Sequence, residues 1–413
     1  MQNIAIIGGG AAGFFAAISA KTTQPDAAVT VFEKAGRVLA KVGVSGGGRC
    51  NLTNSFADIT DLKQAYPRGD KLLKRLFKRF DYSDAYQWFE ARGVRLVTQD
   101  DNCVFPHSQD SQTVIDCLTR TAQRLGVTVC LHHSLTGIAK QAQGKIEVHF
   151  KDKPLRTFDR VIITTGGSPR AAGLQYLAEL GHKIETPVPS LFTFNISEKA
   201  FCNQMGTVVE RVLLSIPATK FRSEGALLVT HWGMSGPATL KLSSYAARHL
   251  AENNYHLAEN NYQSAVAVNW VYETNTQLVE QNLVAIAAEN PRKQMANIRP
   301  YDLPTRLWEY LLHRSDIGKE KRWGELGKKA LHKLVETLTN DVHQISGKGS
   351  FRDEFVTCGG VSLKSINPNT LESKVCEGLF FAGEVLDIDA ITGGFNLQAA
   401  WTTGYVAGQE ASV

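Results

Sequence analysis

The sequence predicts an α/β protein in which a discontinuous, Rossmann-like nucleotide-binding domain is interrupted by an inserted domain of strands and helices. A short apolar strand, a glycine-rich turn and a helix open the chain, and another apolar strand ending in glycine comes close to its C-terminus. Between them lies a region of alternating strand patterns and amphipathic helices. We place the nucleotide-binding domain at residues 1–190 and 342–413 and the insertion at residues 191–341.

The bulk composition is that of a folded protein large enough for two or three domains. Of its 413 residues, 43% are apolar, and 45 basic against 40 acidic residues give a formal charge of +5. That excess is too small to indicate nucleic acid by itself. The seven cysteines are scattered and never form Cys-x-x-Cys. We therefore expect no disulfide framework, no metal site and no redox-active disulfide.

The apolar run at residues 4–20 resembles the core of a secretory signal peptide. No Lys or Arg precedes it, however, and four glycines interrupt it, which favours a strand, turn and helix instead. No other apolar run approaches the ~20 residues needed to span a bilayer. We expect a soluble, cytoplasmic protein that does not contact a membrane.

Hydrophobic periodicity predicts the elements in order. The chain opens with a strand at 4–7, a helix at 11–21 and a strand at 28–32. The first domain continues with a helical region at 62–91 and strands at 127–131, 145–150 and 160–165. In the insertion we expect strands at 192–196, 208–216 and 226–230 and helical segments at 237–250 and 304–338. A heptad repeated at 249–255 and 256–262 predicts a lengthened surface helix, and the chain closes with a strand at 378–382 and a helix at 395–408.

The glycine-rich turn matches the dinucleotide fingerprint G-x-G-x-x-G between a strand and a helix. Gly8 permits the tight turn, Gly10 lets the backbone approach a pyrophosphate, and Gly13 allows close helix packing. The helix N-terminus offers N–H groups to phosphates, and Glu33 can accept hydrogen bonds from a ribose. A glycine-rich turn in some other α/β protein is the structural alternative. The predicted contacts are Gly8, Gly10, Ala11, Ala12, Gly13, Glu33 and Lys34.

Two later segments favour FAD over NAD as the resident cofactor. The strand at 160–165 ends in small residues, and the strand at 378–382 is followed by glycine and an acid. The turn before the last helix could aim backbone N–H groups at the flavin N1–C2=O edge, although it could also only cap a packing helix. Either Asp387 or Asp389 could bond ribityl hydroxyls or hold this turn. The predicted contacts are Thr165, Gly166, Gly383, Glu384, Asp387, Gly393, Gly394, Phe395, Asn396 and Leu397.

Strings spread over the whole chain resemble the BaiN/RdsA-type family of bacterial NAD(P)/FAD-dependent oxidoreductases, a branch of the glutathione-reductase-like flavoproteins. They lie at residues 45–54, 104–106, 230–237, 359–361, 381–387 and 393–398. The resemblance implies an FAD domain of glutathione-reductase type with an inserted β-barrel and helices, and tightly but non-covalently bound FAD. A bile-acid intermediate reductase is the best-known activity of the family, and we do not transfer its substrate. Cys358 stands where the family pattern leads us to expect Ala.

The loop at residues 46–54 is expected to hold the pyrophosphate–ribityl stretch of the cofactor. Its predicted contacts are Gly46, Arg49, Cys50, Asn51 and Leu52, and Leu135 is expected as a further contact. Arg49 could offset phosphate or reduced-flavin charge, or it could be a surface cation that caps a turn. We interpret Cys50 as a small packed residue rather than a nucleophile.

One histidine in the insertion is a candidate proton donor. His231 precedes a turn and a helix start at Ser235-Gly236-Pro237, where Ser would cap and Pro would begin the helix. In a domain that covers the flavin, such a histidine could protonate a substrate. A histidine bonded to local backbone is the structural alternative.

These observations lead to two functional hypotheses. In the first, NAD(P)H delivers hydride to flavin N5, and the flavin passes it to an unidentified small organic acceptor. Because a second G-x-G-x-x-G is absent from the sequence, we expect NAD(P)H to bind only transiently. The alternative is a nucleic-acid-associated flavoprotein, in which basic helices at 71–79 and 319–333 touch phosphates. We regard nucleic acid as the weaker hypothesis because charged helix faces are usually solvated.

Overall fold

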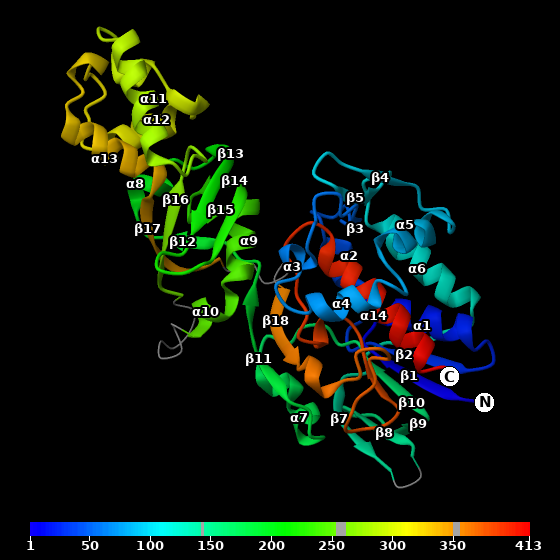
Figure 1. Cartoon of the computed structure of the whole chain (residues 1–413). Helices are drawn as coiled ribbons and strands as arrows, with labels where there is room; N and C mark the ends of the chain where they lie inside the picture. The colour runs from blue at the N-terminus through cyan, green and yellow to red at the C-terminus, as the bar shows by residue number, and fades with distance from the viewer. Residues whose placement is uncertain (142–143, 253–261, 350–355) are drawn as a thin grey trace. The chain divides into compact units, whose positions relative to one another are not determined.

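The computed structural model describes residues 1–141, 144–252, 262–349 and 356–413, which form two compact units (Figure 1). The first unit comprises Met1–Ser190 and Phe351–Val413, and the second comprises Leu191–Ser350. The sequence placed the return to the first domain at residue 342, but Asp341–Lys348 forms strand β17 of the second unit. This strand pairs with two strands of the second unit, so the chain leaves that unit only after it.

A five-stranded parallel sheet is the centre of the first unit, and its order is β19-β10-β1-β2-β6. The strands are β19 (Leu379–Phe381), β10 (Arg160–Ile163), β1 (Asn3–Ile7), β2 (Ala28–Phe32) and β6 (Thr128–Cys130). Ile6 lies opposite Ile162, and Ile162 lies opposite Phe380. Because the strands are parallel, their carboxyl ends meet at one edge, where ligands bind in folds of this class.

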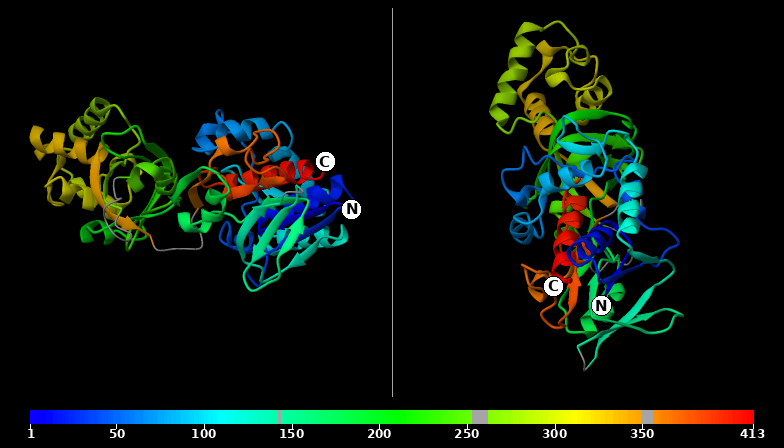
Figure 2. Two further views of the ribbon diagram at one scale, coloured as in Figure 1. Left: turned by 90° about the horizontal axis from the view of Figure 1, so that it is seen from below. Right: turned by 90° about the vertical axis from the view of Figure 1, so that its right-hand side faces the viewer.

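Helices α1 (Ala11–Thr23) and α14 (Phe395–Glu410) run parallel to one another in the first unit. Figure 1 and Figure 2 both show them side by side, in blue and red. A Cβ on Gly404 would lie 2.5 Å from Ala12 O, and one on Gly408 would lie 2.3 Å from Ala16 O. Gly404 thus lies beside Ala12 and Gly408 beside Ala16, so the two helices advance in step. Because α14 starts nine residues before Gly404 and α1 only one residue before Ala12, the N-terminus of α14 extends eight residues, or about 12 Å, beyond the N-terminus of α1.

The rest of the first unit consists of short helices and three small antiparallel sheets. The helical region expected at 62–91 is three helices, because Gly69 adopts φ 86° and Asp81 caps a new helix. The helices are α2 (Ala40–Val44), α3 (Leu62–Ala65), α4 (Asp70–Leu76), α5 (Tyr82–Glu90), α6 (Gln112–Arg124) and α7 (Gln175–Glu179). The sheets contain β3 (Thr53–Asn54), β5 (Cys103–Pro106) and β4 (Leu96–Thr98); β7 (Leu135–Lys140), β8 (Ile146–Phe150) and β9 (Arg156–Phe158); and β11 (Ile184–Ser190) with β18 (Val356–Val361).

The second unit is built on a closed barrel with the strand order β12-β15-β14-β13-β16-β17. The strands not yet described are β12 (Phe194–Ile196), β13 (Val208–Ser215), β14 (Arg222–Thr230), β15 (Gly233–Ser235) and β16 (Ser264–Asn269). Its helices are α8 (Lys199–Cys202), α9 (Pro237–Tyr245), α10 (Ala247–Glu252), α11 (Thr276–Glu289), α12 (Thr305–Arg314) and α13 (Lys328–Thr339). Most of the repeated heptads, residues 253–261, lies outside the described residues.

Candidate nucleotide site in the first unit

At the N-terminus of α1, the backbone is tightly packed at two of the motif glycines and open at the third. Its first residue follows Gly10, and no side chain caps it. A Cβ on Gly8 would lie 2.4 Å from Thr164 O, and one on Gly13 would lie 2.0 Å from Gly8 O. A Cβ on Gly10, in contrast, would meet nothing within 4 Å. Gly8 and Gly13 are therefore required by backbone packing, whereas Gly10 leaves room for a ligand at the positive end of the helix.

Glu33 is fixed at the carboxyl end of β2 by two backbone donors. Its Oε2 accepts a hydrogen bond from Gly9 N at 2.8 Å, and its Oε1 accepts one from Ala35 N at 2.8 Å. Each oxygen keeps a lone pair with which it could accept a ribose hydroxyl. Of the other residues predicted here, Lys34 is exposed and Leu135, at the start of β7, is half-buried.

The N-terminus of α14 is held by the loop at residues 51–54. In the amide orientation that satisfies both of its polar atoms, Asn51 donates to Thr53 O at 3.0 Å and accepts from Gly394 N at 3.3 Å. Asn54 Nδ2 donates to Gly393 O at 3.1 Å. Gly394 adopts φ 87° and precedes α14 without a side-chain cap. The predicted loop and the predicted turn, more than 300 residues apart in sequence, therefore form one structure, and it ends in an open helix N-terminus.

Two polar side chains hold the turn before α14 in place. The Asn396 amide accepts a hydrogen bond from Ala390 N at 2.9 Å and donates to Ala390 O at 3.1 Å. This side chain is occupied by the turn itself, so Asn396 could contact a cofactor through its backbone N–H. Asp389 is fully buried, pairs with Arg68 and accepts from Ser190 Oγ at 2.8 Å. Burial raises the pKa of Asp389 against the opposing effect of Arg68.

The strand ends β10 and β19 bring further predicted residues to the same edge. Gly166 adopts φ 75° with nothing within 4 Å of a Cβ, and Gly383 N donates to Thr403 Oγ1 at 2.9 Å. Glu384 accepts from Thr357 N at 2.7 Å and from Lys41 Nζ at 2.9 Å. Glu384 is thus an anchored carboxylate beside open backbone, rather than a free one.

Arg49 and Cys50 are engaged within their own loop. Arg49 Nε donates to Gly46 O at 3.2 Å, and its guanidinium lies 4.3 Å from the centroid of the Phe105 ring. This is the turn-capping arrangement considered from the sequence. Cys50 is fully buried, and burial raises the pKa of its thiol to about 12 despite a hydrogen bond with Ser45. It therefore remains a thiol, in agreement with a packing role.

His231 belongs to the second unit, in the turn between β14 and β15. The side chain is exposed, and its ring lies edge-on to Trp232 with centroids 4.4 Å apart. Among the described residues, its ring nitrogens form no hydrogen bond to local backbone, which was the structural alternative. Its role as an acid stays a prediction.

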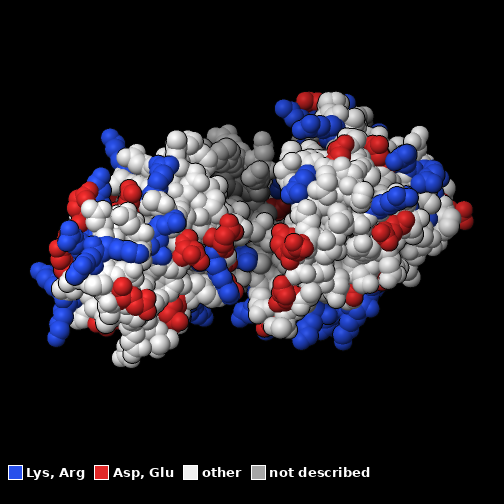
Figure 3. Space-filling view, turned by 90° about the horizontal axis from the view of Figure 1, so that it is seen from above, with Lys and Arg blue, Asp and Glu red and all other residues white. Residues whose placement is uncertain are grey.

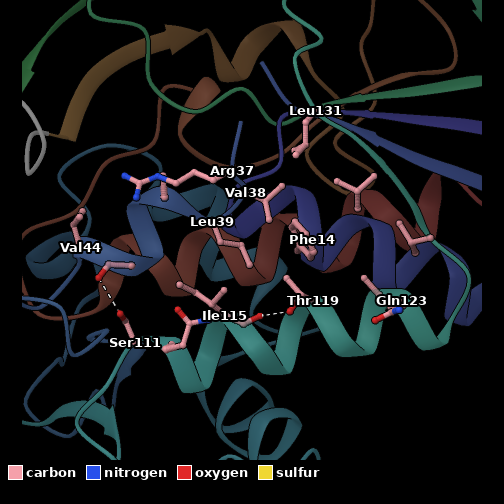
Figure 4. A pocket seen from close by; sticks show the side chains of 16 residues that line it. Phe14, Arg37, Val38, Leu39, Val44, Ser111, Ile115, Thr119, Gln123 and Leu131 are labelled. Atoms are coloured by element: carbon pink, nitrogen blue, oxygen red, sulfur yellow. Dashed lines mark hydrogen bonds between the residues drawn. The ribbon is translucent and has the colours of Figure 1, made fainter. Parts of the chain in front are cut away.

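A cavity of about 790 Å³ lies between α1, residues 37–44 and α6 (Figure 4). Its wall is mainly apolar and includes Phe14, Leu39, Ile115 and Val129. None of the predicted cofactor contacts lines it. It is therefore distinct from the open backbone at the two helix N-termini.

The second unit contains a buried group of charged side chains. Both ring nitrogens of His343 are hydrogen-bonded to carboxylates: Nε2 lies 2.8 Å from Asp341 Oδ2, and Nδ1 lies 3.1 Å from Glu198 Oε2. Arg314 pairs with both carboxylates, and Trp270 Nε1 donates to Asp341 at 3.0 Å. Burial alone would lower the pKa of His343, but the hydrogen bonds that its ring donates to Asp341 and Glu198 outweigh burial and raise that pKa. Hydrogen bonding to His343 lowers the pKa of Glu198.

The part of the chain that the structure describes contains no group of three or more His, Cys, Asp or Glu side chains that could hold a metal ion. No helix in that part combines the length and apolar character needed to cross a bilayer.

Residues 2–410 match the family described as "HI0933-like protein Rossmann domain". A 3-dehydro-bile acid delta(4,6)-reductase of Clostridium scindens is 27% identical over 100% of this chain and 99% of that protein. A ribosomal RNA dihydrouridine synthase of Escherichia coli is 27% identical over 98% of this chain and 96% of that protein. One of Haemophilus influenzae is 26% identical over the same shares.

The fold also resembles a solved enzyme structure. The 3-ketosteroid-delta4-(5alpha)-dehydrogenase of Rhodococcus jostii aligns over 100% of this chain and 97% of that chain. The TM-score is 0.51 and the sequence identity 15%. At that identity the likeness concerns the fold alone.

Proposed function

The chain belongs to the HI0933-like Rossmann family, and from this premise we propose that it is an FAD-dependent reductase of conjugated carbon–carbon double bonds. The family match confirms the predicted resemblance, and the Rossmann-type FAD-binding fold with a closed barrel is the predicted fold class. The membership places the chain among FAD-binding oxidoreductases. The donor, the acceptor and the residue roles below are our proposal.

The proposal rests on the offset of about 12 Å between the N-termini of α1 and α14. Two uncapped helix N-termini face the same direction about 12 Å apart along their axes. Open backbone at Gly10 and Gly166 and the loop anchored on Asn51 belong to the same unit. This spacing suits an extended ligand with a pyrophosphate at one end and an electron-accepting ring at the other, as in FAD.

Each part of this arrangement has a proposed task. The N–H groups at the start of α1 bind the pyrophosphate, and the Glu33 carboxylate accepts hydrogen bonds from the ribose hydroxyls. The N–H groups at the start of α14 stabilise negative charge on the flavin N1–C2=O edge. Bound FAD supplies hydride transfer from NAD(P)H to the organic acceptor. We keep His231 as the proposed donor of the accompanying proton.

The proposed acceptor class rests on the relatives' names. A delta(4,6)-reductase of a 3-dehydro bile acid and a dihydrouridine synthase both add hydrogen to a double bond conjugated with a carbonyl group. In such a bond the carbonyl withdraws electrons, which makes the distal carbon a hydride acceptor. A small conjugated carbonyl compound is our leading acceptor.

A uridine in RNA is the second candidate acceptor. Two relatives named as ribosomal RNA dihydrouridine synthases align with 98% of this chain. A free small molecule and an RNA uridine present the same conjugated bond to the flavin, so the two candidates differ in how the rest of the substrate is bound.

The test is an anaerobic reaction in two halves. In stopped-flow mixing, NADH or NADPH should bleach the oxidised flavin, and if both leave it oxidised the proposed donor is wrong. The reduced protein is then mixed with a 3-oxo-Δ4 steroid or with unmodified ribosomal RNA. Reoxidation with a product heavier by two hydrogens, about 2 Da, identifies the acceptor. A His231→Gln variant should slow this second half without changing flavin reduction; an unchanged rate would remove His231 as the acid.

A further inference from the structure

Two basic segments of the second unit, far apart in sequence, lie against each other. Residues 291–295 and 318–329 are joined by three backbone hydrogen bonds of 2.8–3.0 Å. Met295 N donates to Lys321 O, Trp323 N donates to Lys293 O, and Gly324 N donates to Pro291 O. We call these two segments together the basic platform.

The basic platform has a high local excess of positive charge. It has seven basic and two acidic residues, a formal excess of five that equals the excess of the whole 413-residue chain. Six of the basic side chains are exposed and Lys321 is half-buried. Among the described residues none of the seven forms an ion pair, and Figure 3 shows Lys and Arg gathered at the helical end of the second unit. The seven are Arg292, Lys293, Lys319, Lys321, Arg322, Lys328 and Lys329.

Buried tryptophans hold the platform rigid. Trp323 lies between Arg322 and Gly324, is fully buried, and stacks on Trp308 with ring centroids 6.3 Å apart. Trp308 Nε1 donates to Met295 O at 2.8 Å, so it also fixes the other segment. The charged side chains therefore project from a fixed backbone, which lowers the entropic cost of binding a ligand.

Helix α13 adds to the positive potential. It begins after Gly327 without a side-chain cap or an acidic residue in its first turn, and Lys328 and Lys329 occupy that turn. Lysine at a helix N-terminus opposes the helix dipole and costs stability. Departures of this kind from local preference are expected at sites that bind something.

The other basic segment seen in the sequence, residues 71–79, uses its two arginines within the first unit. Arg79 pairs with Glu410 and donates to Gln409, while Arg75 donates to Asn369. These guanidinium groups hold the C-terminal segments in place. The lysines of this segment, Lys71, Lys74 and Lys78, are exposed and form no ion pair among the described residues, but no second basic segment is hydrogen-bonded to them as in the platform.

We propose that the basic platform binds the phosphate backbone of RNA, an inference that rests on the RNA candidate of the proposed function. Unpaired, exposed and fixed cations match a polyanion. The large hydrophobic residues that the structure leaves exposed lie outside the platform, whereas membrane-surface binding needs apolar groups to insert. The platform also lacks exposed aromatic rings for base stacking, so it positions the RNA without reading its sequence.

The test compares two triple variants with equal charge change in the full-length, FAD-loaded protein. One carries Lys319→Gln, Lys328→Gln and Lys329→Gln; the control carries Lys71→Gln, Lys74→Gln and Lys78→Gln on α4 and the turn that follows it. A fluorescently labelled ribosomal RNA fragment is titrated at several salt concentrations. The platform variant should bind at least about tenfold more weakly, with a salt slope smaller by about 2. The control should change affinity less than about twofold.

Equal losses in both variants, or no loss in either, would overturn the proposal. So would binding of the platform to vesicles containing phosphatidylserine with no binding of RNA. Both variants should keep the wild-type flavin spectrum and its bleaching by NAD(P)H, because the proposed flavin site lies in the first unit and none of the substituted residues belongs to it. If bleaching fails while RNA binding depends on the platform, the proposed reductase is wrong and the platform stands. If bleaching succeeds while RNA binding is absent, the platform proposal fails alone.

Discussion

In the first unit two long helices begin at glycines without a side-chain cap, whereas in the second unit the buried charged groups satisfy one another. Gly10 and Gly394 leave helix N–H groups open at the edge of a parallel sheet. Asp341, His343 and Arg314 instead form a closed network inside the barrel unit. Open donors predispose a region to bind anions, and paired charges predispose a region to keep one conformation. Substitutions at the open donors of the first unit should therefore affect ligand binding, and substitutions in the charged network of the second unit should affect stability.

The largest effect is expected for Asp341→Ala in the second unit. This change leaves Arg314, His343 and the Trp270 N–H without their shared acceptor in a buried site. We expect a loss of about 3–5 kcal/mol in the free energy of unfolding, measured by urea denaturation of the second unit. Flavin absorbance should persist at urea concentrations where the second unit is already unfolded. Asp316→Ala, which breaks an exposed pair with Lys333, is the control and should leave stability unchanged.

Glycine-to-alanine substitutions at two positions of the first unit should distinguish a glycine that backbone packing requires from one that cofactor binding requires. Gly13→Ala drives a Cβ to 2.0 Å from Gly8 O and should cost about 3 kcal/mol, with loss of flavin. Gly10→Ala meets open space, so the melting temperature of the flavin-free protein should not change. Its Kd for FAD should rise about tenfold, or about 1.4 kcal/mol, because the methyl group occupies the approach of the pyrophosphate. Fluorescence titration with FAD measures this, and an unchanged Kd would argue against a pyrophosphate at Gly10.

A smaller, pH-dependent effect is expected from His343. Asp341 and Glu198 raise its pKa in the folded state despite burial, so the folded protein binds the proton more tightly than the unfolded chain does. This contribution is complete below the unfolded pKa of about 6.5 and is lost as pH rises through the folded pKa. Urea midpoints of the second unit should therefore fall with rising pH above about 6.5. His343→Gln should flatten that dependence, and an equal slope in the variant would assign it to another group.

The smallest effect is expected at Cys50. Its thiol is buried and its pKa is about 12, so the native protein should resist iodoacetamide at this position at neutral pH. Mass spectrometry of digested, alkylated protein measures this, and Cys50 should become reactive only after unfolding. Rapid modification of Cys50 in the native protein would contradict its interpretation as a packed residue.

The core of the first unit could be predicted because its local and tertiary signals agree. The strand predicted at 28–32 is β2, and the helix predicted from residue 11 begins there. Glycines that packing requires, such as Gly13, are visible as a spaced motif. The loop at 51–54 and the turn at 393–394 were predicted separately, but only the structure shows that they bond to each other.

The features that sequence could not supply depend on contacts between distant residues. Strand β17 turns Asp341 and His343 inward together with Ile345, so its buried face is partly polar and the usual apolar alternation is weak. The basic platform joins segments that are more than 20 residues apart through backbone hydrogen bonds. Asn396 was predicted as a cofactor contact, yet its amide is used by the turn at residues 390–391. In each case the sequence shows the residue type but not its partner.

The visible absorption spectrum of the purified protein tests most directly whether the two staggered helix N-termini hold one flavin. We expect oxidised-flavin bands near ~450 nm with about one flavin per chain. Denaturation with acid should release this flavin as intact FAD, because we expect the binding to be non-covalent. Protein that stays colourless after purification and after incubation with excess FAD would contradict the assignment of the site.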